Sequence, residues 1–364
     1  MKVPFLDLKA AAADIAPAIE TALLQAARSG QYVMGPELER FETEFAAYCE
    51  ANHCLGVANG LDALRLGLEA MGVGAGDEVI VPANTYIATW LAVSQCGATP
   101  VPVEPIEATH NIDPDAVAEA ITSKTKVILA VHLYGQPADL DALRVVADQH
   151  GLQILEDAAQ AQGARYKSDC IGAKGTATFS FYPSKNLGAL GDGGALVTND
   201  SDIAHQVGLL RNYGSEFKYV HEVKGLNSRL DPLQAAVLSV KLQVLDDWNS
   251  RRRAIAQRYS TAFSKAGLVP PFVPEWAEPV WHLYVMRHAD RDKFQKRLRD
   301  AGIATVIHYP IPPHLQNAFA DLGYEAGRFP LSEALAREVI SLPMCPAQTD
   351  EQTEYVIDTV LKSL

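Results

Sequence analysis

The sequence predicts an α/β fold: a large domain with a mostly parallel sheet flanked by helices on both faces, followed by a smaller C-terminal α+β domain. Two observations lead to this prediction. Between residues 54 and 155 short apolar runs alternate with helical patterns, and repeated strand and helix units of this kind build parallel sheets. A proline-rich segment, Val269 to Pro274, reads as a linker. We assign residues 1–248, with the N-terminal segment, to the large domain and residues 249–364 to the small one.

In the large domain the apolar runs predict strands and the longer patterns predict helices. The expected strands are 54–58, 78–81, 100–103, 127–133 and 153–155, and the expected helices are 61–71, 86–96, 115–121 and 140–150. Two β-rich runs follow, 176–182 and 194–198, and no helix separates them. The loop between them is therefore expected to face a cleft.

The remaining pattern is mainly helical. A helical stretch from Asp231 through Phe263 is expected to break near Trp248 and Asn249. The small domain is expected to contain strands 281–286 and 305–308, a helix 290–301, and helices around Leu335 and Tyr355. Arg251 to Arg253 form the only basic run, which reads as a solvated helix face.

Composition excludes several classes of protein. The net charge of −13 opposes nucleic-acid binding, and no apolar run approaches the roughly 20 residues that span a bilayer. The N-terminus lacks a signal-peptide core, so a cytoplasmic protein without membrane contact is expected. The odd count of five cysteines, with no Cys-x-x-Cys pair and no His pairing at metal spacing, predicts neither a disulfide framework nor a metal site.

Lys185 is the strongest functional candidate. It lies in Ser180-Phe181-Tyr182-Pro183-Ser184-Lys185-Asn186-Leu187-Gly188, ahead of the glycine-rich run 191–194. An amine that forms an imine with an aldehyde must be partly unprotonated, which a confined turn favours over an open helix face. Together with the acidic strand end at Asp157, the lysine predicts a pyridoxal phosphate site.

Other side chains fit the parts of that cofactor. Asp157 follows a buried strand, where a carboxylate can keep the pyridine nitrogen protonated and make the ring an electron sink. An ordinary strand-end or helix-cap aspartate is the alternative reading. Gln160 is a candidate for the ring hydroxyl, and Tyr86 for stacking on the ring, although it could equally be a half-buried helix aromatic.

A phosphate position is expected at a strand-to-helix turn. Gly60 and Leu61 would offer unpaired backbone N–H groups at a helix N-terminus, and Ser180 could add its hydroxyl. The segment His308-Tyr309-Pro310-Ile311-Pro312-Pro313-His314 sets polar side chains in a stiff proline frame that can hold them towards a ligand. Its two histidines could also bind a metal, but no third ligand is near in sequence, and we expect no metal.

These motifs together resemble the DegT/DnrJ/EryC1/StrS family of nucleotide-sugar aminotransferases, a branch of the fold-type I pyridoxal phosphate enzymes. The likeness covers nearly the whole chain, through Pro4 to Leu8, Gly30 to Pro36, Glu156 to Gln160, Ser184 to Gly188, Gly191 to Gly194 and Gly225 to Arg229. One departure is the phosphate turn, which reads Asn59-Gly60-Leu61 where members commonly carry Ser-Gly-Thr. Backbone N–H groups would then hold that side of the phosphate.

The resemblance implies roles for particular residues. Lys185 would be the catalytic lysine that bonds the cofactor, Asp157 the pyridinium partner, Gln160 the ring-hydroxyl contact and Ser180 a phosphate ligand. Asn227 would reach the phosphate of the other subunit, because the family forms homodimers with active sites shared across the interface. The residues expected to contact the substrate are Tyr32, Met34, Tyr182, His308, Tyr309 and His314.

Within the family, the 308–314 segment and Trp281 to Tyr284 look most like enzymes that aminate C3 of a dTDP-3-keto-6-deoxyhexose, with L-glutamate as donor. A C4 aminotransferase that acts on a 4-keto nucleotide sugar would share the cofactor motifs. A pyridoxal phosphate-binding regulatory protein without catalysis is a further alternative, although no DNA-binding module or basic stripe supports it. Relatives with His in place of the lysine act as sugar dehydratases, which Lys185 argues against.

Overall fold

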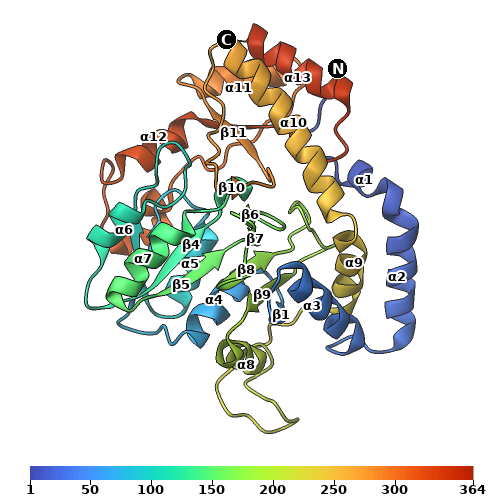
Figure 1. Ribbon diagram of the computed structural model, residues 1–364, viewed down its shortest axis with the longest axis vertical. Coiled ribbons are helices and arrows are strands. Elements are labelled where there is room, and N and C mark those ends of the chain that lie inside the picture. The colour runs from blue at the N-terminus through green and yellow to red at the C-terminus, as the bar shows by residue number, and fades with distance from the viewer. Residues whose placement is uncertain (364) are drawn as a thin grey trace.

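A computed structural model describes residues 1–363 and confirms the predicted α/β fold. Its centre is a seven-stranded sheet with the strand order β1-β9-β8-β5-β4-β2-β3 (Figure 1). The strands of this sheet are β1 (His53–Val57), β2 (Glu78–Pro82), β3 (Thr99–Val103), β4 (Thr125–Val131), β5 (Gln153–Asp157), β8 (Thr176–Ser180) and β9 (Gly194–Thr198).

Strand β9 is the only antiparallel member of this sheet. Strands β8, β5, β4, β2 and β3 run parallel to one another, whereas β9 runs against both β8 and β1. The chain reverses between β8 and β9 without a helix, as the sequence predicts. Because β5 and β8 are parallel neighbours, Asp157, Ser180 and the turn that carries Lys185 all lie at the carboxyl edge of the sheet.

Helices cover both faces because the strand side chains alternate. Val79 and Val81 of β2 pack with α4 (Gly60–Ala70) and α5 (Ile87–Gln95) on one face. Ile80 points the other way and packs with α6 (Pro114–Ala120) and α7 (Leu140–His150). The long apolar runs of the central strands are therefore buried on both sides.

A separate apolar core forms in the C-terminal part, at the top of Figure 1. It joins α10 (Leu245–Lys265), α11 (Arg291–Asp300) and α13 (Asp350–Lys362) to a two-stranded sheet of β11 (Tyr284–Arg287) and β12 (Val339–Leu342). Val3 from the N-terminus packs in this core and pairs with Ile303. The expected division between residues 248 and 249 falls inside α10 and stays a prediction.

The remaining elements lie around these two cores. They are α1 (Leu8–Ala11), α2 (Ala16–Ser29), α3 (Pro36–Tyr48), α8 (Ser201–Leu210), α9 (Pro232–Leu242), α12 (Pro330–Glu338) and the short strands β6 (Arg165–Tyr166), β7 (Asp169–Cys170) and β10 (Ala277–Glu278). Below α8 in Figure 1 the chain makes a long loop before it returns to α9. No helix within residues 1–363 combines the length and the apolar character that a membrane crossing requires.

Three local expectations were wrong. The break between α9 and α10 falls at residues 243 and 244, because Asn249 is buried inside α10 and bonded to neighbouring loops. Residues 305–308 form no strand, and only Val306 makes an isolated bridge, to Ser341. Arg252 is buried rather than solvated, and its guanidinium donates to the carbonyl oxygen of Met344 at 3.0 Å.

Candidate active site

A cavity of about 500 Å³ opens at the carboxyl edge of the sheet and contains Lys185. It is formed by the starts of α4 and α5, the ends of β4, β5 and β8, the lysine turn, and two segments of the C-terminal part. The structure brings together in it ten of the residues that the sequence marks out: Gly60, Leu61, Tyr86, Asp157, Gln160, Ser180, Tyr182, Lys185, His308 and Tyr309.

Lys185 lies in a tightly bonded turn. Its backbone N–H donates to the carbonyl oxygen of Tyr182 at 2.8 Å, and Ala189 closes the turn by donating to Phe181 at 2.8 Å. A Cβ at Gly188 would lie 2.4 Å from the carbonyl oxygen of Pro183, so this turn requires a glycine. The backbone that carries the lysine is therefore held in one position.

The amine of Lys185 is easier to deprotonate than an ordinary lysine. Burial lowers its pKa to about 8, and the carboxylate of Asp157 opposes that shift. At pH 7 a lysine of this pKa is unprotonated in roughly one molecule in ten, against fewer than about one in a thousand at the ordinary value. The amine can therefore act as a nucleophile or as a proton acceptor.

Asp157 is buried at the end of β5 with part of its carboxylate free. Oδ1 accepts from the N–H of Ala159 at 3.1 Å, and Oδ2 accepts from the hydroxyl of Thr89 at 2.9 Å. Burial raises its pKa, while these two hydrogen bonds and the charge of Lys185 lower it. A buried carboxylate with spare acceptor capacity suits a cationic N–H partner.

The amide of Gln160 has a defined orientation. Its Oε1 accepts from the backbone N–H of Tyr134 at 2.6 Å, and its Nε2 donates to the hydroxyl of Tyr309 at 2.9 Å. A backbone N–H can only donate, so the oxygen must face Tyr134 and the nitrogen must face the cavity side. The second N–H of Gln160 is then available to an oxygen in the cavity.

The start of α4 gives the cavity a position that suits an anion. Asn59 caps α4 by accepting from the N–H of Asp62 at 2.8 Å, while the N–H groups of Gly60 and Leu61 have no partner within residues 1–363. A Cβ at Gly60 would lie 2.6 Å from Cβ of Ser180, so the glycine lets β8 approach the helix N-terminus. Two free N–H groups, a helix dipole and a serine hydroxyl together suit a phosphate.

These features fit pyridoxal phosphate. One cavity is lined by a buried carboxylate, by an anion position at the start of α4 and by a lysine with a lowered pKa. Tyr86 supplies an aromatic face, and its ring lies 5.2 Å from that of Tyr309. The carboxylate suits the ring nitrogen of the cofactor, the anion position suits its phosphate, and the lysine suits its aldehyde.

His308 and Tyr309 bring the C-terminal part to the cavity. His308 Nδ1 lies 2.8 Å from the hydroxyl of Ser341, and burial together with the charge of Lys185 lowers the His308 pKa to about 4. The hydroxyl of Tyr134 donates to the carbonyl oxygen of His308 at 2.6 Å. His308 is therefore a neutral polar group in the wall of the cavity.

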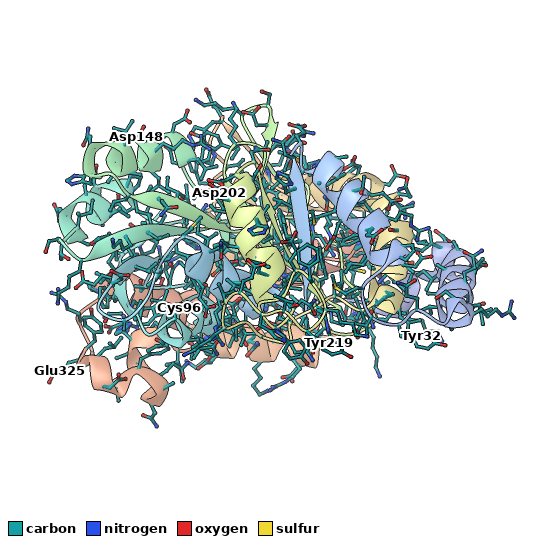
Figure 2. All side chains as sticks on the ribbon, turned by 90° about the horizontal axis from the view of Figure 1, so that it is seen from below. Tyr32, Cys96, Asp148, Asp202, Tyr219 and Glu325 are labelled. Carbon is teal, nitrogen blue, oxygen red and sulfur yellow. The ribbon has the colours of Figure 1, made fainter. Side chains whose placement is uncertain are left out.

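Four residues expected at the site lie outside this cavity. Tyr32 and Met34 belong to the segment between α2 and α3, and Figure 2 shows Tyr32 at the periphery of the molecule. Asn227 is exposed in the loop before α9. His314 is buried between Glu333 and Phe329, with its Nε2 3.1 Å from Glu333 Oε1, and its expected substrate contact stays a prediction.

Several polar residues of the cavity were not among the expected site residues, and Thr89 and His282 are two of them. Thr89 holds the carboxylate of Asp157, and its position one turn after Tyr86 on the expected helix is a signal that could have identified it. His282 lines the cavity beside Lys185. Its contacts come from the lysine turn, far away in sequence, so no local pattern indicates them.

A larger cavity of about 770 Å³ borders the site but has no lysine in its lining. Leu133 lines both cavities. Within residues 1–363 the structure gathers no three His, Cys, Asp or Glu side chains into a metal-binding arrangement. The smaller cavity is therefore the one with the chemistry that the sequence predicts.

Known proteins resemble the chain over almost its whole length. A model of the DegT/DnrJ/EryC1/StrS aminotransferase family matches residues 13–361. The erythromycin biosynthesis sensory transduction protein EryC1 of Saccharopolyspora erythraea is 57% identical over 99% of this chain and 99% of its own. The dTDP-3-amino-3,4,6-trideoxy-alpha-D-glucose transaminase of Streptomyces venezuelae is 53% identical, with 99% and 95% covered.

A solved structure has the same fold in detail. The crystal structure of DesV from S. venezuelae, in complex with a ketimine intermediate, superimposes with a TM-score of 0.97 at 53% identity. The match covers 99% of this chain and 98% of DesV. A match of this extent covers the segments that line the cavity.

Proposed function

The chain belongs to the DegT/DnrJ/EryC1/StrS aminotransferase family, and from that premise we propose that it transfers the amino group of L-glutamate to C3 of a dTDP-3-keto-6-deoxyhexose. It is a pyridoxal phosphate-dependent nucleotide-sugar aminotransferase. The products would be 2-oxoglutarate and a dTDP-3-amino-3,6-dideoxyhexose. The donor, the sugar and the C3 position are the proposed parts.

The proposal rests mainly on the presence of Lys185 and Asp157 in one cavity. One cavity contains a lysine whose pKa falls to about 8 and a buried carboxylate with free acceptor capacity. Pyridoxal phosphate, when bound, supplies a ring that takes up the electrons released with a substrate proton. Residues of this chain would bind the cofactor and transfer the proton.

Each side chain would have a separate task. Asp157 would accept a hydrogen bond from the ring nitrogen and keep it protonated, and Gln160 would donate to the ring hydroxyl. Gly60, Leu61 and Ser180 would hold the phosphate with two N–H groups and one hydroxyl. With both ends of the cofactor fixed, its reactive carbon would face Lys185.

Lys185 would be the proton carrier of both half-reactions. Its amine would take the proton from Cα of glutamate, and in the second half-reaction it would deliver a proton to C3 of the sugar. One amine must therefore reach Cα of glutamate in the first half-reaction and C3 of the sugar in the second. A long side chain on a rigid backbone segment permits this. A pKa of about 8 suits both directions near neutral pH.

The C3 position is supported by the name of a relative. The 53% identical transaminase of S. venezuelae is named for a sugar with its amino group at C3 and no oxygen at C4. Tyr182, His308 and Tyr309 line the cavity and would contact the sugar. The alternative is amination at C4 of a 4-keto nucleotide sugar, for which the cofactor contacts would be the same.

We also propose a homodimer in which Asn227 of each subunit reaches the phosphate site of its partner. Asn227 is exposed and its side chain makes no hydrogen bond within residues 1–363, so it is free to reach another subunit. The loop before it exposes several apolar side chains, which a partner would cover: Tyr213, Phe217, Tyr219, Val220 and Val223. Figure 2 labels Tyr219, which is 83% exposed.

A cytoplasmic location is proposed with this function. All five cysteines are free, and four of them are buried, as in proteins of a reducing compartment. A regulatory role without catalysis is the remaining alternative, since one relative is named a sensory transduction protein. The lysine and its carboxylate partner favour catalysis.

The test is to locate the nitrogen in the product. The protein, with pyridoxal phosphate and L-glutamate, is incubated separately with dTDP-linked 3-keto and 4-keto 6-deoxyhexoses, and with a 3-keto sugar that lacks the 4-hydroxyl. NMR then identifies the aminated carbon. Nitrogen at C3 is the expected result, whereas nitrogen only at C4 would replace the proposed position and leave the mechanism in place.

A further inference from the structure

Asn186, the residue after Lys185, connects the lysine turn to His282. Its Oδ1 lies 3.1 Å from His282 Nδ1. Its Nδ2 donates to Asn249 Oδ1 at 2.8 Å and to the carbonyl oxygen of Val280 at 3.0 Å. A carbonyl oxygen can only accept, so the Asn186 amide has its nitrogen towards Val280 and its oxygen towards His282.

The neighbouring amide gives the same orientation. Asn249 donates from Nδ2 to the carbonyl oxygen of Gln162 at 2.9 Å, which leaves its Oδ1 as the acceptor for Asn186. The three buried side chains therefore form one directed series of hydrogen bonds that starts at His282 and ends on backbone carbonyls. Reversal of either amide would place its oxygen against a backbone carbonyl oxygen, so that two acceptors would face each other.

This series determines which nitrogen of His282 carries hydrogen. Because Asn186 Oδ1 can only accept, Nδ1 of His282 must donate. The ring is neutral, since burial, together with the charges of Lys185 and Arg252, holds the pKa of His282 well below its usual range. A neutral ring with hydrogen on Nδ1 has an unprotonated Nε2.

Nε2 of His282 has no hydrogen-bond partner in the described part of the chain. The atom is not enclosed by protein. The ring lines the same cavity as Lys185. The wall of the site that contains the amine therefore includes a permanent hydrogen-bond acceptor.

We infer that, with the cofactor bound, Nε2 of His282 accepts a hydrogen bond from the amine of Lys185 after that amine has been displaced from the cofactor, and so aims it at the reacting carbon. His282 is a positioning residue, because it acts through Lys185. A lysine side chain has four flexible bonds, and its lone pair must point at the carbon from which it takes the proton. Asn186 directly follows Lys185 in the lysine turn. Its hydrogen bond to His282 therefore fixes the ring relative to the turn that carries the amine.

The inference rests on the proposed role of Lys185 as proton carrier, so its test needs a signal other than turnover. The holoenzyme is loaded with pyridoxamine phosphate, in which form Lys185 is not bonded to the cofactor. Competitive acetylation with acetic anhydride between pH 6 and 10, read by mass spectrometry of the Lys185 peptide, gives the pKa of the amine. The same preparations, returned to pyridoxal phosphate, give the rate of the glutamate half-reaction.

Two variants distinguish the effect of the acceptor atom of His282 from the effect of the ring's volume. His282→Leu removes the acceptor at similar volume, whereas His282→Gln restores an oxygen that can accept. In His282→Leu we expect a lower Lys185 pKa, because the ammonium loses an acceptor, and a half-reaction about 10- to 100-fold slower with little change in KM for glutamate. His282→Gln should recover part of the Lys185 pKa and part of the half-reaction rate. His205→Leu, at a half-exposed histidine outside the cavity, should change neither the pKa nor the rate.

Two results would overturn the inference. A Lys185 pKa and a half-reaction unchanged in His282→Leu would mean that the ring is only structural, and a raised Lys185 pKa would mean that His282 had carried a charge. If the wild-type protein showed no glutamate half-reaction, the proposed function would fail, while the acetylation profile would still decide the role of His282.

A spectroscopic measurement tests the tautomer directly in the unaltered ring. In holoenzyme labelled with ¹⁵N-histidine, the long-range ¹H–¹⁵N correlation that disappears in His282→Gln belongs to His282. We expect a protonated Nδ1 and an unprotonated Nε2 between pH 6 and 8. Hydrogen on Nε2 instead would contradict the inference, whether or not either variant is active.

Discussion

The hydroxyl of Thr89 donates to Oδ2 of Asp157 at 2.9 Å and joins the start of α5 to the end of β5. The hydroxyl of Thr85 lies 2.9 Å from that of Thr89. The carboxylate thus obtains one of its two protein hydrogen bonds from a neighbouring helix rather than from its own loop. Its orientation, and not only its burial, is therefore built into the fold.

Replacement of Thr89 by Val should weaken that orientation. The shape is nearly preserved, but the carboxylate loses a hydrogen bond to a charged group, which typically contributes about 1.5 to 3 kcal/mol. We expect the affinity for pyridoxal phosphate to fall about tenfold or more, as measured by equilibrium dialysis. Thr89→Ser should retain most of the affinity, and Thr21→Val, on the exposed side of α2, should not affect it. Equal affinities for Thr89→Val and wild type would contradict the role of the hydroxyl.

The pKa of Lys185 should depend on Asp157. Burial lowers it to about 8, and the carboxylate raises it relative to burial alone, because a negative charge favours the ammonium form. In Asp157→Asn the amine should therefore titrate below pH 8, and at pH 7 a larger fraction should be unprotonated. Competitive acetylation of the cofactor-free variant and wild type measures the two values. A rise on removal of the carboxylate would mean that the two groups do not interact as the geometry indicates.

Lys185→Ala should separate binding from catalysis. The contacts for the ring nitrogen, the ring hydroxyl and the phosphate remain, so cofactor binding should persist, while the proton carrier is lost. We expect turnover at least about 10²-fold below wild type, since general acid–base groups contribute 10²- to 10⁴-fold. Lys241→Ala, at a second buried lysine that donates to Gly188, is the comparison for the effect of removing a lysine near this turn. Retention of wild-type turnover in Lys185→Ala would rule out the mechanism.

The order of strands and helices could be predicted because their signals are local. The pattern at 140–150 predicts α7 to the residue, and that at 194–198 predicts β9, since apolar periodicity and flanking turns lie within each segment. The helices α1, α2, α3 and α8 were not predicted.

The site could be predicted as a set of residues but not as a network. Lys185, Asp157 and Gly60 follow from motif positions, whereas the orientation of Gln160 depends on Tyr134 and Tyr309, which are brought to it by tertiary packing. The burial of a charged side chain is also hard to predict, because it too depends on tertiary packing. Arg252 belongs to a basic run that looks solvated, yet carbonyl oxygens from residues some 30 and 90 positions away surround its guanidinium.

The phosphate turn gives a prediction that needs no assumption about the substrate. Gly60 has an ordinary backbone conformation, so an alanine there would not strain the helix, but its Cβ would lie 2.6 Å from Cβ of Ser180. To relieve that contact β8 must move away from the start of α4, and the serine hydroxyl then separates from the N–H groups of Gly60 and Leu61. We therefore expect Gly60→Ala to bind pyridoxal phosphate at least about tenfold more weakly by equilibrium dialysis, since each hydrogen bond to a charged group contributes about 1.5 to 3 kcal/mol. Gly74→Ala is the matched control, because nothing lies within 4 Å of its Cβ position. If Gly60→Ala bound pyridoxal phosphate as tightly as Gly74→Ala, the anion would have to be held elsewhere in the cavity.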